Sequence, residues 1–406
     1  MAARQFDAAM LPKLDLTRGE QEAIQLEARA VIDRALVLEA EFRRRGGAIN
    51  QKKWKEVMAR DNFHVYKRRK SSRHGKFVLD DEIKLPELMS MRAHDDVSRR
   101  AWFQSFTNET DSTTSSRESV DDIEAPPIIT CAGYVEGKLE DVIYGAYDGN
   151  EAEWKLRSAY LKDKLSEARI LATIEGPTHE DPCRFLGIKW FSTEYPPGLG
   201  VFISKRDSLV IEAIGITTDS QGERHGYLVV HDYYDPRIPE LTDYGIIRNK
   251  LSVCFLSRQV TPDRVAIYGC AFLDLGGNLP SSVAISIGAL TLVSTANTVD
   301  ASYNKKLVWL MNQQQAQRRM TKDQLALPRV SSCHSCHKIP RLRGLTPCCA
   351  CAREFCSACA VERRLVVDAP TDHRDVTWRN LKFCFACILR AKELPAVHVA
   401  RVTNKA

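Results

Sequence analysis

Nine of the 13 cysteines fall in one short segment of the chain, and eight of them are spaced as pairs. Each pair has two residues between its cysteines: Cys333/Cys336, Cys348/Cys351, Cys356/Cys359 and Cys384/Cys387. Zinc binds four thiolates at tetrahedral corners, and a two-residue spacer lets one turn supply two adjacent corners. Four such pairs predict two closed structural zinc sites. Cys349 is left over, and we interpret His334 and His337, which lie beside ligands, as surface residues because eight cysteines already suffice.

The start of the chain does not read as a secretory signal. Asp7 and Pro12 interrupt the region where a signal peptide needs an unbroken apolar stretch. We therefore expect a cytoplasmic protein, whose clustered cysteines are metal ligands rather than disulfides. The longest apolar run, 282–294, is shorter than the roughly 20 residues of a membrane-spanning helix. The remaining cysteines stand singly among apolar residues, which predicts inert core thiols: Cys131, Cys183, Cys254 and Cys270.

The net charge of +6 over 406 residues allows attraction to anionic membranes or nucleic acid, but requires neither. One basic stretch, 67–76, contains six Lys and Arg residues without the interleaved aromatics that single-stranded nucleic acid would need for stacking. We favour a solvated hairpin loop there over a membrane- or RNA-facing patch. Nucleic acid is therefore not an expected partner.

The elements that must position the cysteines can be read from the preceding residues. Thr17 and Glu20 form a capping-box pattern, and apolar residues then recur at helical spacing as far as Phe42, which predicts a helix packed on its own domain. Residues 104–127 are polar and predict a disordered insertion. The Asp148-Gly149-Asn150 turn predicts a helix over 151–167.

Six β-rich runs separated by turn residues predict a large antiparallel sheet: 128–135, 184–191, 208–216, 226–234, 250–257 and 264–275. After Pro280, the sequence runs almost without Gly or Pro to Arg319, which predicts one long, kinked C-terminal helix. The predicted class is α+β. His179, His225 and His231 with Asp232 are scattered, and we interpret them as surface or loop residues.

Several short motifs in this region resemble START domains, which bind single lipids in a helix-grip fold. They are the segments 54–57 and 61–68, the Ser204-Lys205-Arg206-Asp207 element, and the loop from Asp274 to Pro280, in the family's order. The resemblance covers roughly Gln51 to Gln317. It implies a curved antiparallel sheet, a long C-terminal helix across it, and a lipid or other apolar ligand.

The cysteine segment is similar to a FYVE zinc finger, above all from Cys348 to Cys359, where Phe355 precedes the fifth ligand. The resemblance implies a small cross-brace finger with interleaved pairs. Cys333, Cys336, Cys356 and Cys359 would hold one zinc ion, and Cys348, Cys351, Cys384 and Cys387 the other. It also implies contact with phosphoinositides and a peripheral position on endosomal membranes.

The segment departs from the FYVE pattern where that family binds phosphatidylinositol 3-phosphate. Gly344 to Pro347 replaces the basic run before the third ligand, and the Trp-x-x-Asp expected before the first ligand is absent. A loop of cations and aliphatics remains as a candidate membrane contact: Lys338, Ile339, Arg341, Leu342, Arg343 and Leu345. The alternative, that Leu342 and Leu345 pack the interior of the finger, stays open.

These patterns predict five parts: an N-terminal helical segment (1–50), a START-like domain (51–317) with the disordered insertion (104–127), a linker (318–332), a FYVE-like finger (333–390) and a tail (391–406). We expect a non-enzymatic protein, because the chain has no nucleophile elbow, phosphate-binding loop or convergent carboxylates. The predicted function is lipid binding with membrane or protein contact by the finger. The alternative is a protein-interaction scaffold or a RING-like ubiquitin ligase.

Overall fold

The computed structural model describes residues 6–69, 128–162, 165–193, 204–277, 279–320, 331–340, 344–370 and 375–404. Four predictions fall wholly or largely outside these ranges. They are the insertion 104–127, the basic stretch beyond residue 69, the linker 318–332 between residues 321 and 330, and the loop residues Arg341, Leu342 and Arg343.

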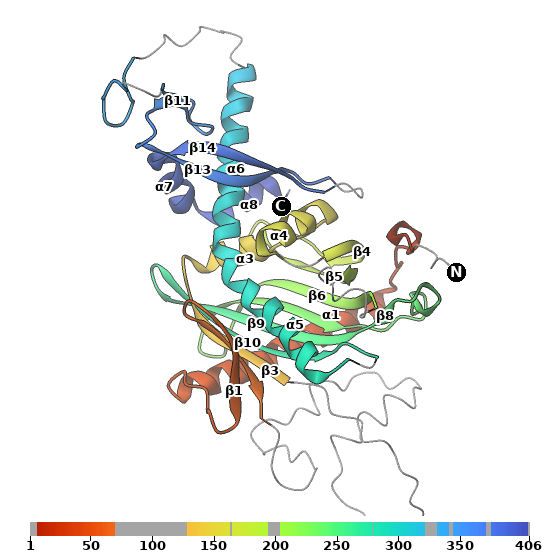
Figure 1. Cartoon of the computed structure of the whole chain (residues 1–406). Coiled ribbons are helices and arrows are strands. Elements are labelled where there is room, and N and C mark those ends of the chain that lie inside the picture. The colour runs from red at the N-terminus through yellow and green to blue at the C-terminus, as the bar shows by residue number, and fades with distance from the viewer. Residues whose placement is uncertain are drawn as a thin grey trace, which may run out of the picture.

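A ten-stranded sheet forms the centre of the fold, in the order β1-β2-β3-β10-β9-β7-β6-β5-β4, with β8 pairing β6 (Figure 1). All neighbours along this path are antiparallel, and only the short β8 is parallel to its partner. The strands are β1 (Trp54–Arg60), β2 (Phe63–Arg68), β3 (Ile128–Glu136), β4 (Leu165–Glu175), β5 (Phe185–Thr193), β6 (Arg206–Thr218), β7 (Arg224–Asp232), β8 (Ile247–Arg248), β9 (Lys250–Thr261) and β10 (Arg264–Asp274). Every predicted β-rich run is a strand, so the antiparallel sheet and the α+β class are confirmed.

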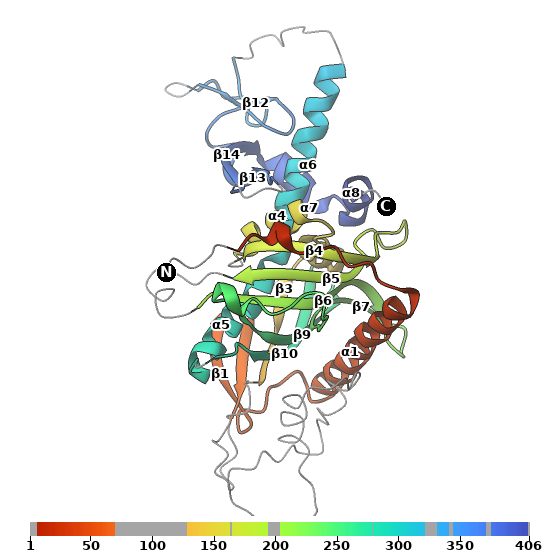
Figure 2. The same ribbon diagram turned by 90° about the vertical axis from the view of Figure 1, so that its right-hand side faces the viewer.

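One face of the sheet is covered by α1 (Arg18–Arg44), which lies on the opposite side from the long C-terminal helix (Figure 2). The predicted capping box is present: the Glu20 backbone N–H donates to Thr17 Oγ1 (3.3 Å) and the Thr17 N–H donates to Glu20 Oε2 (2.7 Å). Apolar α1 residues such as Ile24 and Val31 pack against Trp190 and other side chains of the sheet. The helix therefore belongs to the same core as the strands.

The other face is covered by α3 (Leu139–Ala146), α4 (Glu151–Leu161), α5 (Ser281–Ser294) and α6 (Thr298–Met320). A 3-10 turn, Thr295–Asn297, joins α5 to α6 and forms the break in the predicted long helix. Two glycines allow close packing here. A Cβ on Gly288 would lie 2.8 Å from Ile129 Cδ1 of the sheet, and one on Gly145 would lie 1.8 Å from the carbonyl oxygen of Thr298.

Taken together across the 3-10 turn, the helical segment Ser281–Gln317 is long and apolar enough to cross a membrane by length and composition. More than half of its most apolar window, 56 %, is buried inside the fold. A core helix laid across a sheet meets the same criteria, so this feature is weak evidence for a membrane span.

Two predictions about local structure need correction. The helix predicted over 151–167 ends at Leu161, because Lys162 adopts a left-handed conformation (φ 63°, ψ 34°), and the edge strand β4 follows. The buried helix α3 was not predicted. All of its eight residues except Glu140 are buried, and about two turns are too short to show a repeating helical pattern in the sequence.

The cysteine segment contains two small hairpins and two helices. The elements are β11 (Thr346–Pro347), β12 (Glu354–Phe355), β13 (Ala360–Asp368), β14 (Thr377–Cys384), α7 (Phe385–Glu393) and α8 (Ala396–Thr403). This finger lies beside the far half of α6 (Figure 1). The predicted boundary at residue 390 falls inside α7, and the residues predicted as a tail form α8.

Candidate metal centres

The eight paired cysteines form two groups of four. Their members are Cys333, Cys336, Cys356 and Cys359 in the first tetrad, and Cys348, Cys351, Cys384 and Cys387 in the second. Within each tetrad, all sulfur atoms lie within 4.8 Å of one another. The first pair thus meets the third, and the second meets the fourth, which is the interleaved arrangement implied by the FYVE resemblance.

The sulfur spacing fits a tetrahedral ion. Cys336 Sγ lies 3.7 Å from Cys356 Sγ, and Cys351 Sγ lies 4.0 Å from Cys384 Sγ. A zinc ion with Zn–S bonds of about 2.3 Å holds its four sulfurs about 3.8 Å apart. Both tetrads can therefore hold a metal, and four sulfur donors favour zinc over the oxygen-preferring cations.

Two matching turns present the first and second pairs. The His337 N–H donates to the Cys333 carbonyl (2.8 Å), and the Ala352 N–H donates to the Cys348 carbonyl (2.8 Å). His337 and Ala352 both have a φ of 59°, so the backbone reverses direction directly after each of these cysteine pairs. The fourth pair differs: Cys384 is the N-cap of α7 and Cys387 lies in its first turn, where the helix dipole stabilises thiolates.

Ionisation is uneven among the eight thiols. At Cys333, burial opposes ionisation, but neighbouring backbone N–H groups outweigh it and lower the pKa to about 6. A hydrogen bond with Cys387 lowers the pKa of Cys348 to about 4. Burial raises the pKa of Cys351 to about 11 and that of Cys359 to about 12. Four thiolates so close together repel one another, and a bound divalent cation would relieve this repulsion.

The two candidate histidines and the ninth cysteine lie outside the tetrads. His334 Nε2 is 2.7 Å from Arg353 Nη1, and its ring packs edge-on against Phe355. His337 is exposed. Cys349 is half-buried, and its backbone N–H donates to the Lys382 carbonyl (2.9 Å), which fastens the second turn to β14. Burial raises the pKa of the Cys349 thiol.

The candidate membrane loop divides between the surface and the finger interior. Ile339 is 69 % exposed and Lys338 is also exposed. Leu345 is half-buried and packs against the finger core. The alternative that Leu345 packs the finger is thus observed, whereas Ile339 remains available at the surface.

The finger shares its hydrophobic core with α6. Leu307 and Leu310 of α6 are 3 % and 5 % exposed, and they belong to the same buried cluster as Leu365, Phe383 and Ile388 of the finger. The hairpin β13–β14 also contacts α4, since the Val366 N–H donates to Tyr160 Oη (3.0 Å). A finger with so small a core depends on these neighbours as well as on its metals.

Lys306 of α6 joins the finger to the sheet domain. Its ammonium group is fully buried and donates to Asp141 Oδ1 of α3 (2.7 Å) and to the carbonyls of Leu394 (2.9 Å) and Lys392 (3.3 Å) at the end of α7. Helix α8 follows directly, and its residues Ala396, Val399 and Ala400 belong to the core cluster of the sheet. The chain after the last cysteine is therefore built into the preceding domain. No motif in the sequence signalled this connection.

A second buried ionic group lies between the sheet and α4. Lys189 Nζ donates to Asp148 Oδ1 (2.6 Å) and Glu212 Oε1 (2.7 Å), and Arg157 pairs with Asp148 (3.0 Å). Burial and the neighbouring Asp148 carboxylate raise the pKa of Glu212 to about 7. Arg157 and Lys189 outweigh burial at Asp148 and lower its pKa. Asp148 thus remains ionised beside the two cations, whereas Glu212 holds its proton to higher pH.

The interpretation of the scattered histidines as surface or loop residues is wrong for His225 and His231. His225 and His231 lie on β7 with only 0 % and 5 % of their surfaces exposed. His225 Nε2 is 3.3 Å from Asp219 Oδ2, and Glu223 completes a group that could bind a cation. Arg43 contacts both carboxylates of this group, so we interpret it as an ion-pair network that ties α1 to the β6–β7 hairpin.

The START-like motifs contact one another. Arg206 is buried and donates through Nε to the Leu275 carbonyl (3.1 Å), in the loop that leads to α5. Asp207 accepts hydrogen bonds from Trp190 Nε1 (2.7 Å) and Arg248 Nε (2.9 Å). This element therefore fixes the approach to the long helix rather than presenting free charges.

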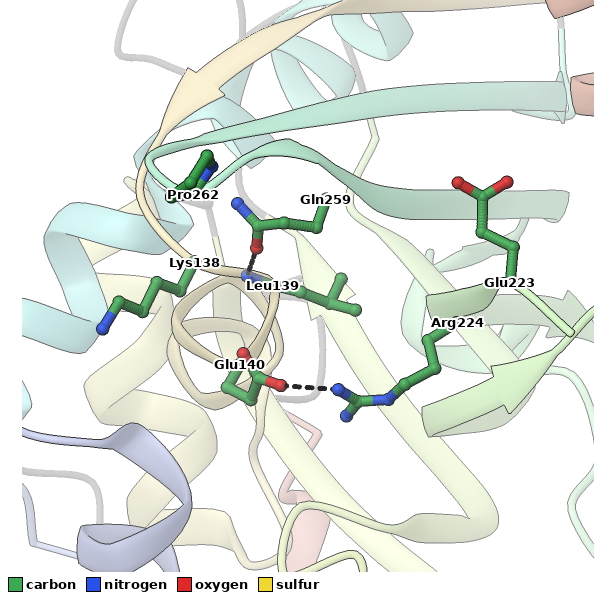
Figure 3. A pocket seen from close by; sticks show the side chains of 7 residues that line it. All are labelled: Lys138, Leu139, Glu140, Glu223, Arg224, Gln259 and Pro262. Carbon is green, nitrogen blue, oxygen red and sulfur yellow. Dashed lines mark hydrogen bonds and ion pairs between the residues drawn. The ribbon is translucent and has the colours of Figure 1, made fainter.

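A pocket of about 410 Å³ lies where α3 begins, between the ends of β7 and β9 (Figure 3). Its polar groups are engaged with each other: Arg224 pairs with Glu140 (3.1 Å), and Gln259 Oε1 accepts from the Leu139 N–H (2.7 Å). The pocket lacks a set of convergent free donors or acceptors, and we assign no ligand to it.

No protein-family model matches the chain, and no curated protein matches it. Among solved structures, human StAR-related lipid transfer protein 5 aligns with a TM-score of 0.40 and 16 % identity, over 69 % of this chain and 97 % of that one. Human STARD10 gives 0.37 and 12 %, over 65 % and 78 %. The lipid transfer and protein localization domain of human StarD13 gives 0.36 and 12 %, over 66 % and 95 %. Because all three TM-scores lie below 0.5, we base no assignment on these matches.

Proposed function

We propose that the chain is a non-enzymatic lipid-binding protein with two structural zinc ions. The sheet and the α5–α6 helix would enclose an apolar ligand, and the finger would contact a membrane or protein surface. The eight cysteines of the two tetrads would hold the zinc ions. We also propose a cytoplasmic position, peripheral on endosomal membranes.

One observation carries the lipid-binding part of this proposal: α5 has no charged side chain anywhere on its circumference. Of its 14 residues, the exposed ones are Leu290 and the hydroxyl residues Ser282, Ser286 and Thr291. Ala289 and Leu292 are buried against the sheet, whereas Leu290 on the outward side is 49 % exposed. A 14-residue helix without a single charge is expected where its outward side also meets weakly polar or apolar surroundings. A cover that moves between a bound lipid and a bilayer would meet that condition.

The proposal is tested by lipid uptake. Purified chain would be stripped of lipid, incubated with mixed-lipid vesicles, separated from them, and measured by native mass spectrometry. We expect one retained lipid per chain. Ala289→Leu adds volume between α5 and the sheet and should reduce uptake, whereas Ala316→Leu, at an exposed position on α6, should not. Folded protein with both zinc ions and no retained lipid would contradict the proposal.

A further inference from the structure

We propose that the outward face of α7 docks on an anionic lipid bilayer. This face consists of Phe385, Ala386 and Leu389, with Glu393 one turn beyond Leu389, Arg390 beside it and Lys382 on the preceding strand. The proposal rests on the proposed function in one respect, namely that the finger works at a membrane. It names a surface that lies outside the candidate loop 338–345.

Helix α7 has two different faces. At 100° per residue, Cys387, Ile388 and Ala391 fall on one side, and all three are buried against the finger core. Phe385 and Leu389 fall together on the other side, one helical turn apart. They are 52 % and 56 % exposed. Neither contributes to the buried clusters formed by the described residues.

Folding gives no reason for these two large apolar side chains to face water. The helix is already held by its other side and by Cys384 and Cys387 of the second tetrad. An aromatic residue and a leucine one turn apart, on the rim of a small module, are typical of a surface that is covered in the working state. A metal held by Cys384 and Cys387 would fix the start of α7 and so keep Phe385 and Leu389 in a rigid position at the surface.

The charges around this face indicate an anionic partner. Lys382 and Arg390 are exposed, and neither forms an ion pair with a carboxylate in the described part of the chain. Two cations thus border this face against one exposed carboxylate, Glu393. Residues 331–404 contain twelve Lys and Arg against six Asp and Glu, whereas the chain as a whole has 58 against 52. The entire excess of positive side chains therefore lies in this segment. Eight thiolates with two zinc ions would add four negative charges inside the finger, but not at this surface.

An apolar strip bordered by cations suits the interface of an anionic bilayer better than a protein groove. Apolar side chains enter the headgroup region while Lys and Arg remain with the lipid phosphates. The strip is convex and short, and a bilayer can cover such a shape without complementary contours. Screening by salt should weaken the cationic part of the interaction and spare the apolar part.

The test uses the full, zinc-loaded chain and two kinds of vesicle, phosphatidylcholine alone and phosphatidylcholine mixed with phosphatidylserine. Co-sedimentation should show binding to the mixed vesicles. Phe385→Ser with Leu389→Ser should lower the partition coefficient about tenfold, because two half-exposed apolar side chains are lost. Lys382→Gln with Arg390→Gln should weaken binding and reduce its dependence on salt.

Helix α1 offers a matched control. Leu26 and Val37 are 63 % and 65 % exposed, and Leu26→Ser with Val37→Ser should leave binding unchanged. Zinc content and thermal unfolding of each variant show whether the finger is intact. Wild-type protein that ignores both vesicles would overturn the proposal and point to an acidic protein as the occupant of this face. Intact Phe385→Ser, Leu389→Ser protein that binds like wild type would also overturn it.

Lipid uptake measured on the same samples separates the two proposals. Protein that takes up lipid but binds vesicles independently of Phe385 and Leu389 would refute the role of α7 alone. Protein that takes up no lipid but needs these residues for vesicle binding would refute the lipid-binding domain alone.

Discussion

Replacing Lys306 with methionine tests whether the finger and the sheet domain form one unit. The ammonium group is fully buried and has three acceptors on two elements, the Asp141 carboxylate and the carbonyls of Lys392 and Leu394. In Lys306→Met, Asp141 would keep only the hydroxyl of Ser302 (2.6 Å) as a described side-chain donor. Breaking a buried ion pair by removing one partner costs about 3–5 kcal/mol. We expect the free energy of unfolding to fall by about this amount.

The measurement is denaturant unfolding followed by tryptophan fluorescence, together with hydrogen exchange of the α7–α8 segment. Exchange should accelerate in α8 as well as at the end of α7, because Lys306 holds the carbonyls between them. Lys306→Met combined with Asp141→Leu should recover much of the loss, since no unpaired charge remains. Lys52→Met, at an exposed loop position, is the control. A loss below about 1 kcal/mol, or exchange confined to the finger, would refute the reasoning.

Three further outcomes follow from the fold. The pKa of Glu212 is raised from 4.5 to about 7 in the folded state, so the folded chain keeps this proton to higher pH than the unfolded chain. The resulting stabilisation is complete below pH 4.5 and is lost as the pH rises through 7. The free energy of unfolding of the wild-type chain should therefore fall across this range, and its dependence on pH should become flatter in Glu212→Gln. Gly145→Ala should destabilise the chain by several kcal/mol, on the order of an overpacked core, because its Cβ would overlap the Thr298 carbonyl. Gly19→Ala is the control, since its Cβ would meet no atom within 4 Å. Equal thermal unfolding of the two variants would show that α3 and α6 are loosely packed. Tyr160→Phe removes the acceptor of the Val366 N–H and should lower the free energy of unfolding by about 1 kcal/mol. Equal hydrogen exchange at Val366 in the wild-type and variant proteins would argue against this contact.

The strands and the cysteine groups were accessible from the sequence because each depends on local pattern. Alternating β-rich runs identify strands from short windows, and the two-residue spacing identifies turns that present two thiolates. The pairing of the tetrads came from a family resemblance, because spacing alone allows neighbouring pairs to combine as readily as alternate ones.

What the sequence could not supply depends on long-range packing. Lys306 is one of two adjacent lysines in a long helix, and only the fold shows that it is buried between α3 and α7. Helix α8 likewise shows no pattern that ties it to the core of the sheet. The end of α4 depended on a left-handed lysine, a conformation that side-chain type does not predict.

The central claim, that two interleaved tetrads hold two zinc ions, is tested most directly by counting zinc in paired serine variants with native mass spectrometry. The wild-type chain should carry two zinc ions. Cys333→Ser with Cys356→Ser removes two ligands of one tetrad and should leave one ion, whereas Cys333→Ser with Cys348→Ser damages both tetrads and should leave none. The opposite pattern, one ion in the second variant and none in the first, would contradict the account and show that neighbouring pairs combine.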